Sequence, residues 1–105
     1  AEWATLASFL GGESFAGGKM KETGTTHWTD PNTGATNESG FSALPAGYRD
    51  GYTGMFNYIA DHGFYWSSIL GDASLYWDTS WYYYGYWDPN FGHERSGFSV
   101  RLVRD

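Results

Sequence analysis

The 105-residue chain contains no cysteine, three prolines, and six Lys or Arg residues against twelve Asp or Glu residues. The absence of cysteine excludes disulfides, so a single small core and backbone pairing must stabilise the fold. The formal net charge is −6 and no Lys or Arg lies between Arg49 and Arg95. This excludes a basic stripe for nucleic-acid phosphates. No apolar run approaches the roughly 20 residues of a membrane-spanning helix, so we expect one domain over residues 1–105 and no membrane insertion.

The first ten residues have the spacing of an amphipathic helix. Apolar side chains recur on one helical face, and Gly11-Gly12 follows as a stop signal. Residues 17–40 are rich in Gly, Thr and Asn, which is typical of a long loop with at most a short strand at 19–21. Trp28 favours an ordered loop, because disordered segments seldom carry a tryptophan. We therefore expect one short helix followed by a long ordered loop.

From Phe41 onward, short apolar stretches alternate with glycine, which predicts strands. Alternation over residues 98–105 predicts a C-terminal strand with at least one half-buried face. The fold class is α+β with a small antiparallel sheet. The expected core consists of large apolar side chains from both halves of the chain: Trp3, Leu6, Leu10, Phe41, Leu44, Trp66, Trp77, Trp81, Phe98, Val100 and Leu102.

Twelve aromatic residues fall between Phe64 and Phe91. If residues 76–91 form one strand, the odd positions carry Trp77, Trp81 and Trp87 and no charge, which indicates a core face. The even positions carry only Tyr, Asp, Ser and Asn, residue types that are common in recognition surfaces. An exposed Tyr ladder that merely stabilises the sheet is the more common explanation of such positions, and the even face alone does not overturn it.

Three segments carry a family resemblance: GFSALPAGYRDGYTGMF, GFYWSS and GFSVRLVRD, in this order. With them the chain resembles the Fibrobacter succinogenes major paralogous domain family, which occurs in secreted and surface proteins of Bacteroidetes. The resemblance implies a C-type lectin-like fold, similar to formylglycine-generating enzymes and to the variable proteins of diversity-generating retroelements. It also implies that the chain is the C-terminal portion of a longer protein, located outside the cell or at its surface.

In retroelement-linked members, the segment between GFYWSS and GFSVR is the one that is diversified. Adenine-directed mutagenesis of AAY codons produces Tyr, Asp, Ser, Asn, His and Phe, but neither Trp nor Glu. The resemblance therefore implies a variable ligand-binding surface within residues 76–93. We expect its contact residues to be Tyr76, Asp78, Ser80, Tyr82, Tyr84, Tyr86, Asp88, Asn90, Phe91 and His93.

Signals for catalysis or metal binding are weak. The chain has no G-x-S-x-G or H-E-x-x-H motif, and it lacks the cysteines that formylglycine-generating enzymes use. Asp72, Asp78 and Asp88 are available carboxylates, but nothing sets two of them at a defined separation. Oxygen-rich segments at 30–38 and 88–90 are better explained as turns than as calcium sites. We expect no enzyme activity, no metal and no cofactor.

These observations predict a non-enzymatic ligand-binding module that recognises a protein or a glycan on a cell surface. The first alternative is a carbohydrate-binding module, since aromatic faces stack on sugar rings. The second alternative is a structural adhesin-tip domain whose Tyr face packs on a partner segment. Exposed aromatics are also compatible with a homo-oligomer.

Overall fold

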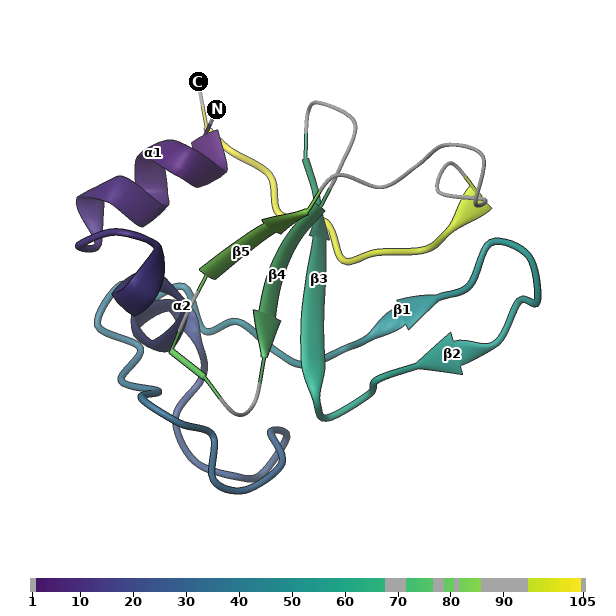
Figure 1. The fold of residues 1–105 in the computed structure, drawn as a ribbon, viewed down its shortest axis with the longest axis horizontal. Coiled ribbons are helices and arrows are strands. Elements are labelled where there is room, and N and C mark those ends of the chain that lie inside the picture. Colours follow the sequence, from purple (N-terminus) through teal and green to yellow (C-terminus); the bar gives the residue numbers. More distant parts are fainter. Residues whose placement is uncertain (1, 68–71, 77–78, 81, 86–94, 105) are drawn as a thin grey trace.

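A computed structural model of the chain describes residues 2–67, 72–76, 79–80, 82–85 and 95–104. Two helices, α1 (Glu2–Phe9) and α2 (Glu13–Met20), come first. A short antiparallel hairpin follows, made of β1 (Tyr48–Arg49) and β2 (Phe56–Asn57). A three-stranded antiparallel sheet then contains β3 (His62–Trp66), β4 (Asp72–Tyr76) and β5 (Tyr82–Gly85), in the order β3-β4-β5 (Figure 1). The predicted α+β class with antiparallel pairing is confirmed.

The N-terminal region contains two helices where one was predicted. Gly11 and Gly12 adopt φ values of 102° and 99°, which end α1, but the Gly12 carbonyl then accepts the Ala16 N–H at 2.9 Å and opens α2. The glycine-rich composition suggested a loop, whereas the structure uses one of these glycines for close packing within a helix. A Cβ on Gly18 would lie 2.3 Å from the Gly34 carbonyl oxygen. The predicted strand at 19–21 reduces to a single bridge between Lys21 and Ala43.

The long segment between α2 and β1 is ordered, as the presence of Trp28 predicted. Trp28 is 1% exposed, and its Nε1–H donates to the Ala43 carbonyl at 3.0 Å. The Asn32 amide donates to the carbonyls of Glu22 and Gly24 at 2.9 and 2.8 Å. The loop is therefore held by side chains that satisfy its own backbone.

The core lies on one face of the three-stranded sheet. Register pairs Tyr65 with Ala73 and Gly63 with Leu75, and opposed residues share a face. α2 contacts β5 on the left of the sheet as drawn in Figure 1. The buried cluster combines helix, loop and strand residues: Ala7, Leu10, Ala16, Met20, Trp28, Ala43, Tyr65, Ala73 and Leu75, with Trp3, Leu6 and Phe41 packed against it.

The predicted C-terminal strand is wrong for the described residues 95–104, which show isolated bridges at Gly97 and Ser99 only. The Ser99 N–H donates to Phe64 O at 2.9 Å, and Ser99 O accepts the Trp66 N–H at 3.0 Å. Beyond this bridge, Val100 and Leu102 are 68% and 88% exposed, so they do not belong to the core. Alternation of apolar residues predicts a face, but a strand also requires a neighbour along its length.

Other predicted core residues have mixed outcomes. Leu10 and Phe98 are buried, and Trp66 is half-buried. Leu44 is 43% exposed and is a further error. Trp77 and Trp81 lie outside the described residues.

One buried lysine connects three segments of the chain. Lys21, directly after α2, is 0% exposed. Its Nζ donates to the carbonyl oxygens of Thr33, Tyr76 and Thr79 at 2.9, 2.9 and 2.8 Å. It also lies 5.3 Å from the ring centroid of Trp28, within cation–π range. We call this arrangement the Lys21 clamp.

Lys21→Met should lower the free energy of unfolding by about 3 kcal/mol or more, because it removes three charge-assisted hydrogen bonds made by a fully buried side chain. Chemical denaturation of the purified domain measures this loss. Lys19→Met is the matched control, since the Lys19 ammonium lies near the surface, 4.0 Å from the Glu38 carboxylate. This exposed pair should contribute less than about 1 kcal/mol. Equal losses in the two variants would contradict a special role for Lys21.

Candidate functional site

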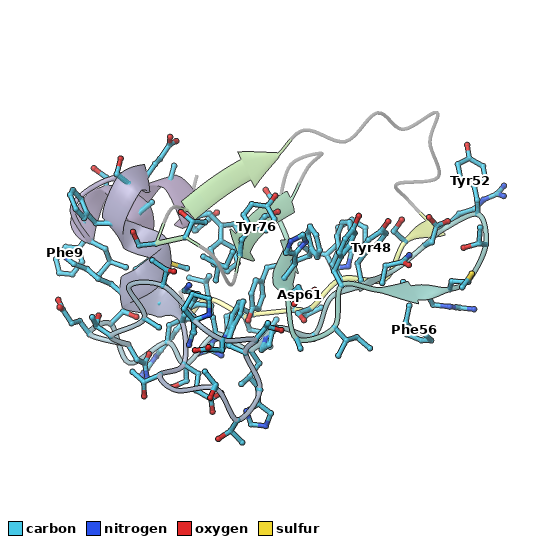
Figure 2. All side chains as sticks on the ribbon, turned by 60° about the horizontal axis from the view of Figure 1, so that its bottom comes forward. Phe9, Tyr48, Tyr52, Phe56, Asp61 and Tyr76 are labelled. Carbon is cyan, nitrogen blue, oxygen red and sulfur yellow. The ribbon has the colours of Figure 1, made fainter. Side chains whose placement is uncertain are left out.

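The sheet face opposite the core carries a continuous layer of aromatic rings. His62, Phe64 and Trp66 alternate along β3 and therefore project to the same side. Tyr76 of β4 is paired with His62. The hairpin region adds Tyr48 and Tyr58, and the C-terminal segment adds Phe98. We call these seven residues the aromatic face: Tyr48, Tyr58, His62, Phe64, Trp66, Tyr76 and Phe98. Figure 2 labels two of them, Tyr48 and Tyr76.

Each ring of the aromatic face contacts another at a favourable distance. The His62 ring stacks on Tyr58 at 4.5 Å and meets the edge of Tyr76 at 4.3 Å. The Tyr48 ring lies 5.3 Å from Phe64 and 6.0 Å from Tyr58. These contacts join β4, β3 and the β1–β2 hairpin into one surface.

The residues of the aromatic face differ in their exposure to solvent. Phe64 and Phe98 are 6% and 9% exposed, whereas Tyr58 is 52% exposed. Tyr48, His62, Trp66 and Tyr76 are half-buried. The pKa of the Tyr48 hydroxyl is raised, first by burial and then by the nearby Asp50 carboxylate and Tyr58. This hydroxyl therefore remains protonated at neutral pH, where it can both donate and accept hydrogen bonds.

Strained backbone positions the exposed Tyr58 ring. Tyr58 has φ 62° and Ala60 has φ 75°, in the left-handed region that costs a non-glycine residue of order 1 kcal/mol or more. Hydrogen bonds hold this turn: the His62 N–H donates to Tyr58 O at 3.0 Å, and the Ala60 N–H donates to Pro45 O at 2.9 Å. The strain thus fixes Tyr58 on the surface of the aromatic face.

The β1–β2 hairpin extends away from the helices and ends in a tight turn. The Asp50 Oδ1 accepts the N–H groups of Tyr52 and Thr53 at 2.7 and 3.0 Å. These two hydrogen bonds close the turn over residues 50–53. Figure 2 shows Tyr52 and Phe56 at the end of the molecule opposite to Phe9. Tyr52 and Phe56 are 62% and 68% exposed, so the hairpin presents large apolar side chains to solvent.

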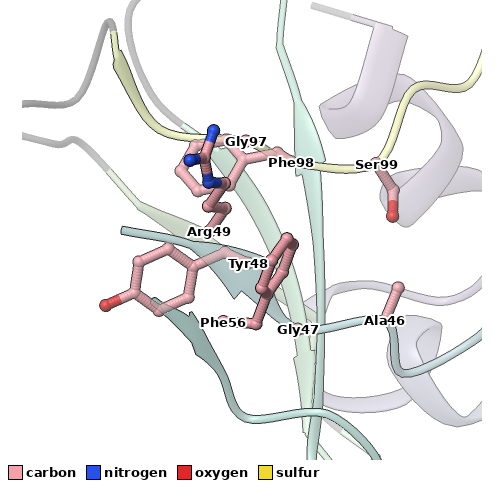
Figure 3. Close-up of a pocket in the computed structure, with 8 residues that line it drawn as sticks. All are labelled: Ala46, Gly47, Tyr48, Arg49, Phe56, Gly97, Phe98 and Ser99. Carbon is pink, nitrogen blue, oxygen red and sulfur yellow. The ribbon is translucent and has the colours of Figure 1, made fainter. Parts of the chain in front are cut away.

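A pocket of about 270 Å³ lies between the hairpin and the C-terminal segment (Figure 3). It is lined by Ala46, Gly47, Tyr48, Arg49, Phe56, Gly97, Phe98 and Ser99. The Arg49 guanidinium lies 5.9 Å from the centroid of the Phe56 ring. The pocket therefore combines aromatic walls with one cationic group.

Few of the predicted contact residues have described side chains. Tyr76 is half-buried and belongs to the aromatic face. Ser80 is half-buried, and its hydroxyl donates to the Ser14 carbonyl at 3.1 Å. Tyr82 and Tyr84 have a described backbone in β5. The remaining six lie outside the described residues: Asp78, Tyr86, Asp88, Asn90, Phe91 and His93.

The single strand assumed over 76–91 is wrong, because the chain reverses between β4 and β5. Backbone register pairs Tyr82 with Leu75 and Tyr84 with Ala73, whereas Tyr76 is paired with His62. Opposed positions share a face, so positions 82 and 84 lie on the other side of the sheet from Tyr76. Even-numbered residues before and after the turn between β4 and β5 therefore do not share one surface.

Sequence reasoning missed the part of the aromatic face that the hairpin region contributes, Tyr48 and Tyr58, and also His62 of β3. A weak signal existed, since large aromatic and apolar residues cluster around a glycine-rich turn at 48–59. Alternation could not reveal the surface, because Tyr58 depends on a left-handed backbone rather than on strand geometry.

Within the described part of the chain, no three His, Cys, Asp or Glu side chains gather as a metal site. His27 accepts or donates a hydrogen bond with Glu22 at 2.7 Å on the surface. Among the same residues, no helix is long and apolar enough to cross a membrane.

Fold and surface together define a small α+β domain with a layer of partly exposed aromatic side chains on one face of its sheet. The sequence model of the Fibrobacter succinogenes major domain matches residues 1–104. The chain therefore belongs to this family, as its motifs predicted. Comparison with curated proteins and with solved structures gave no match.

Gly47→Ala should destabilise the domain by about 3 kcal/mol and disturb the aromatic face. Gly47 has φ 63°, and a Cβ there would lie 2.0 Å from the Asn57 carbonyl oxygen. Gly24→Ala is the matched control, because Gly24 has φ 84° but no atom within 4 Å of a Cβ. Backbone strain alone should cost the control about 1 kcal/mol. Denaturation curves that superimpose for the two variants would refute the close approach at Gly47.

Asp50 should titrate below the usual range for aspartate, since the N–H groups of Thr53 and Tyr52 lower the pKa of its carboxyl. The carboxylate therefore stabilises the folded hairpin above the unfolded pKa of about 3.9, and this contribution is lost as the pH falls through the lower folded value. NMR titration of the Tyr52 and Thr53 amides measures the midpoint. Asp50→Asn should abolish this titration, and a midpoint at or above 3.9 would contradict the turn geometry.

Proposed function

We propose that this domain is a non-enzymatic module that binds a protein or another ligand on a cell surface. The aromatic face carries the proposal. Its buried rings, Phe64 and Phe98, support the half-exposed rings of Tyr48, Tyr58, His62 and Tyr76. A ligand would therefore meet side chains whose positions are already fixed, which reduces the entropy lost on binding.

The chemistry of the exposed rings supports recognition rather than catalysis. Tyrosine offers a rigid apolar surface together with a hydroxyl that hydrogen-bonds, and it is enriched among residues that dominate binding energy. Tyr58 is 52% exposed although it is held in a strained backbone conformation. Strain retained at an exposed aromatic is easier to explain by binding than by stability.

We further propose a C-type lectin-like fold, an extracellular or cell-surface location, and diversification of the segment 76–93 by a retroelement. Family membership supports these proposals, and β4 places the first residue of that segment, Tyr76, on the aromatic face. The coding DNA tests the last of them. A nearby repeat that differs from the codons of residues 76–93 only at adenines would support diversification, and its absence would make the surface a fixed one.

A carbohydrate-binding module is the second candidate. The pocket beside Tyr48 and Phe56 favours it, because about 270 Å³ bounded by aromatic rings has room for one sugar ring. Arrays of bacterial glycans and of extracellular protein domains distinguish the two candidates, since each supplies one class of ligand.

Tyr58→Ala should weaken binding to the strongest array ligand by about 30-fold, or roughly 2 kcal/mol, while the melting temperature changes little. Tyr52→Ala is the matched control, because Tyr52 is similarly exposed but lies at the hairpin tip outside the aromatic face. Surface plasmon resonance measures both affinities. Equal affinities of wild type and Tyr58→Ala would remove the aromatic face from the proposed site.

The same assay tests the predicted contact residues with the variants Tyr82→Ala and Tyr84→Ala, and Tyr83→Ala serves as the comparison. The contact set predicted from the sequence requires a loss of affinity at positions 82 and 84 and little effect at 83. Backbone register pairs position 83 with Ser74 and Ser74 with Phe64, so position 83 lies on the same face of the sheet as these two residues. A loss of affinity confined to Tyr83→Ala would therefore correct the predicted set while leaving the module a binding domain.

A further inference from the structure

Arg49 is a cation at the rim of a pocket in an acidic chain. The chain has a formal net charge of −6, and Arg49 lies in β1 at the base of the exposed hairpin turn. No carboxylate pairs with its guanidinium among the described residues, whose charge pairs are Lys19–Glu38 and His27–Glu22. The neighbouring Asp50 carboxylate is instead occupied by the amides of Tyr52 and Thr53.

The Arg49 side chain is nevertheless held in place. Its backbone exchanges two hydrogen bonds with Gly97, at 2.9 and 3.0 Å. Its Nε–H donates to the Gly54 carbonyl at 3.2 Å, and its guanidinium lies over Phe56. These contacts employ Nε and the face of the guanidinium, so they fix its orientation without using the two terminal nitrogens.

Two glycines leave the space that this arrangement needs. A Cβ on Gly54 would lie 3.2 Å from the Arg49 Nη2, and a Cβ on Gly97 would lie 3.3 Å from the Arg49 Cβ. Gly54 also has φ 72°, a conformation that other residues rarely adopt. Arg49 thus resembles a preorganised receptor more than a mobile surface arginine, and little entropy is lost when it binds.

The pocket beside Arg49 has the walls and the size for one ring. Tyr48, Phe56 and Phe98 supply aromatic surface, and Ser99 supplies a hydroxyl (Figure 3). Its volume of about 270 Å³ lies just below the roughly 300 Å³ at which pockets for drug-sized ligands begin. The Arg49 and Gly97 backbones already bond to each other, so they offer no edge for an extended peptide.

We propose that this pocket binds an acidic sugar: a pyranose ring that lies against the aromatic wall while its carboxylate pairs with the Arg49 guanidinium. A guanidinium fork matches the two oxygens of a carboxylate, and this charge-assisted pair is stronger than a neutral hydrogen bond. This inference names a ligand class for the proposed binding function and rests on it. Because the whole chain is acidic, preference for an acidic over a neutral sugar depends on Arg49.

The test uses the whole chain and two matched probes, trigalacturonic acid and its methyl ester, which has the same rings without the charge. Titrations followed by ¹H–¹⁵N NMR measure both affinities. The acid should bind at least tenfold more tightly than the ester and should shift the amides of Gly54 and Gly97 and the Arg49 Nε–H. Raising the salt concentration should weaken the acid more than the ester.

Single substitutions test whether the preference for the acid over the ester comes from Arg49. Arg49→Gln should weaken binding of the acid by about 30-fold and leave the ester nearly unchanged. Arg49→Lys keeps the charge without the fork and should lose about tenfold. Arg104→Gln is the control for net charge, because Arg104 is an exposed arginine outside the pocket. It should bind the acid as wild type does.

Three results would overturn the inference: equal affinity for acid and ester, equal losses in Arg49→Gln and Arg104→Gln, or tighter binding of hexaglutamate than of trigalacturonic acid. The last result would assign the site to acidic peptides. If Arg49→Gln has no effect while Tyr58→Ala still weakens binding to the array ligand, the proposed function stands and this pocket is not its site.

Discussion

The hydrogen bonds of the Lys21 ammonium are the interactions on which the described structure depends most. It joins the end of α2 to the loop at Thr33 and to the chain at Tyr76 and Thr79, which are far apart in sequence. Burying carbonyl groups without donors is costly, so arrangements that separate these segments are disfavoured. In a chain without cysteine, a single cation at three carbonyls does what a disulfide would do in other small domains.

The clamp also connects the core to the aromatic face. The Tyr76 carbonyl accepts the Lys21 Nζ at 2.9 Å, while the Tyr76 ring meets His62 at 4.3 Å on the other side of the sheet. The end of β4 is therefore fixed from one side and presents a ring on the other. The strained turn at Tyr58 adds a second ring against His62, so two of the rings that contact His62 belong to residues held by their backbones.

Sequence patterns predicted what depends on neighbouring residues and failed where distant contacts decide. The first helix and the ordered loop around Trp28 were correct, because helical spacing and the presence of a tryptophan are signals in the local sequence. The second helix was missed because Gly18 is required by contact with Gly34, which composition does not reveal. The predictions of a C-terminal strand and of one continuous strand over 76–91 failed, because both depend on which strands lie alongside.

A surface that varies in sequence must not depend on its own side chains for folding. The Lys21 clamp meets this condition at Tyr76 and Thr79, because it binds their carbonyl oxygens, which every residue type supplies. Similarly, Gly18 N–H donates to the Ser80 carbonyl at 2.9 Å. The start of the proposed variable segment is thus held to the core by its backbone. The side chains there also make contacts, because the Tyr76 ring meets His62 at 4.3 Å and the Ser80 hydroxyl donates to the Ser14 carbonyl at 3.1 Å. A substitution at Thr79 or Ser80 would leave the backbone hydrogen bonds to Lys21 and Gly18 available.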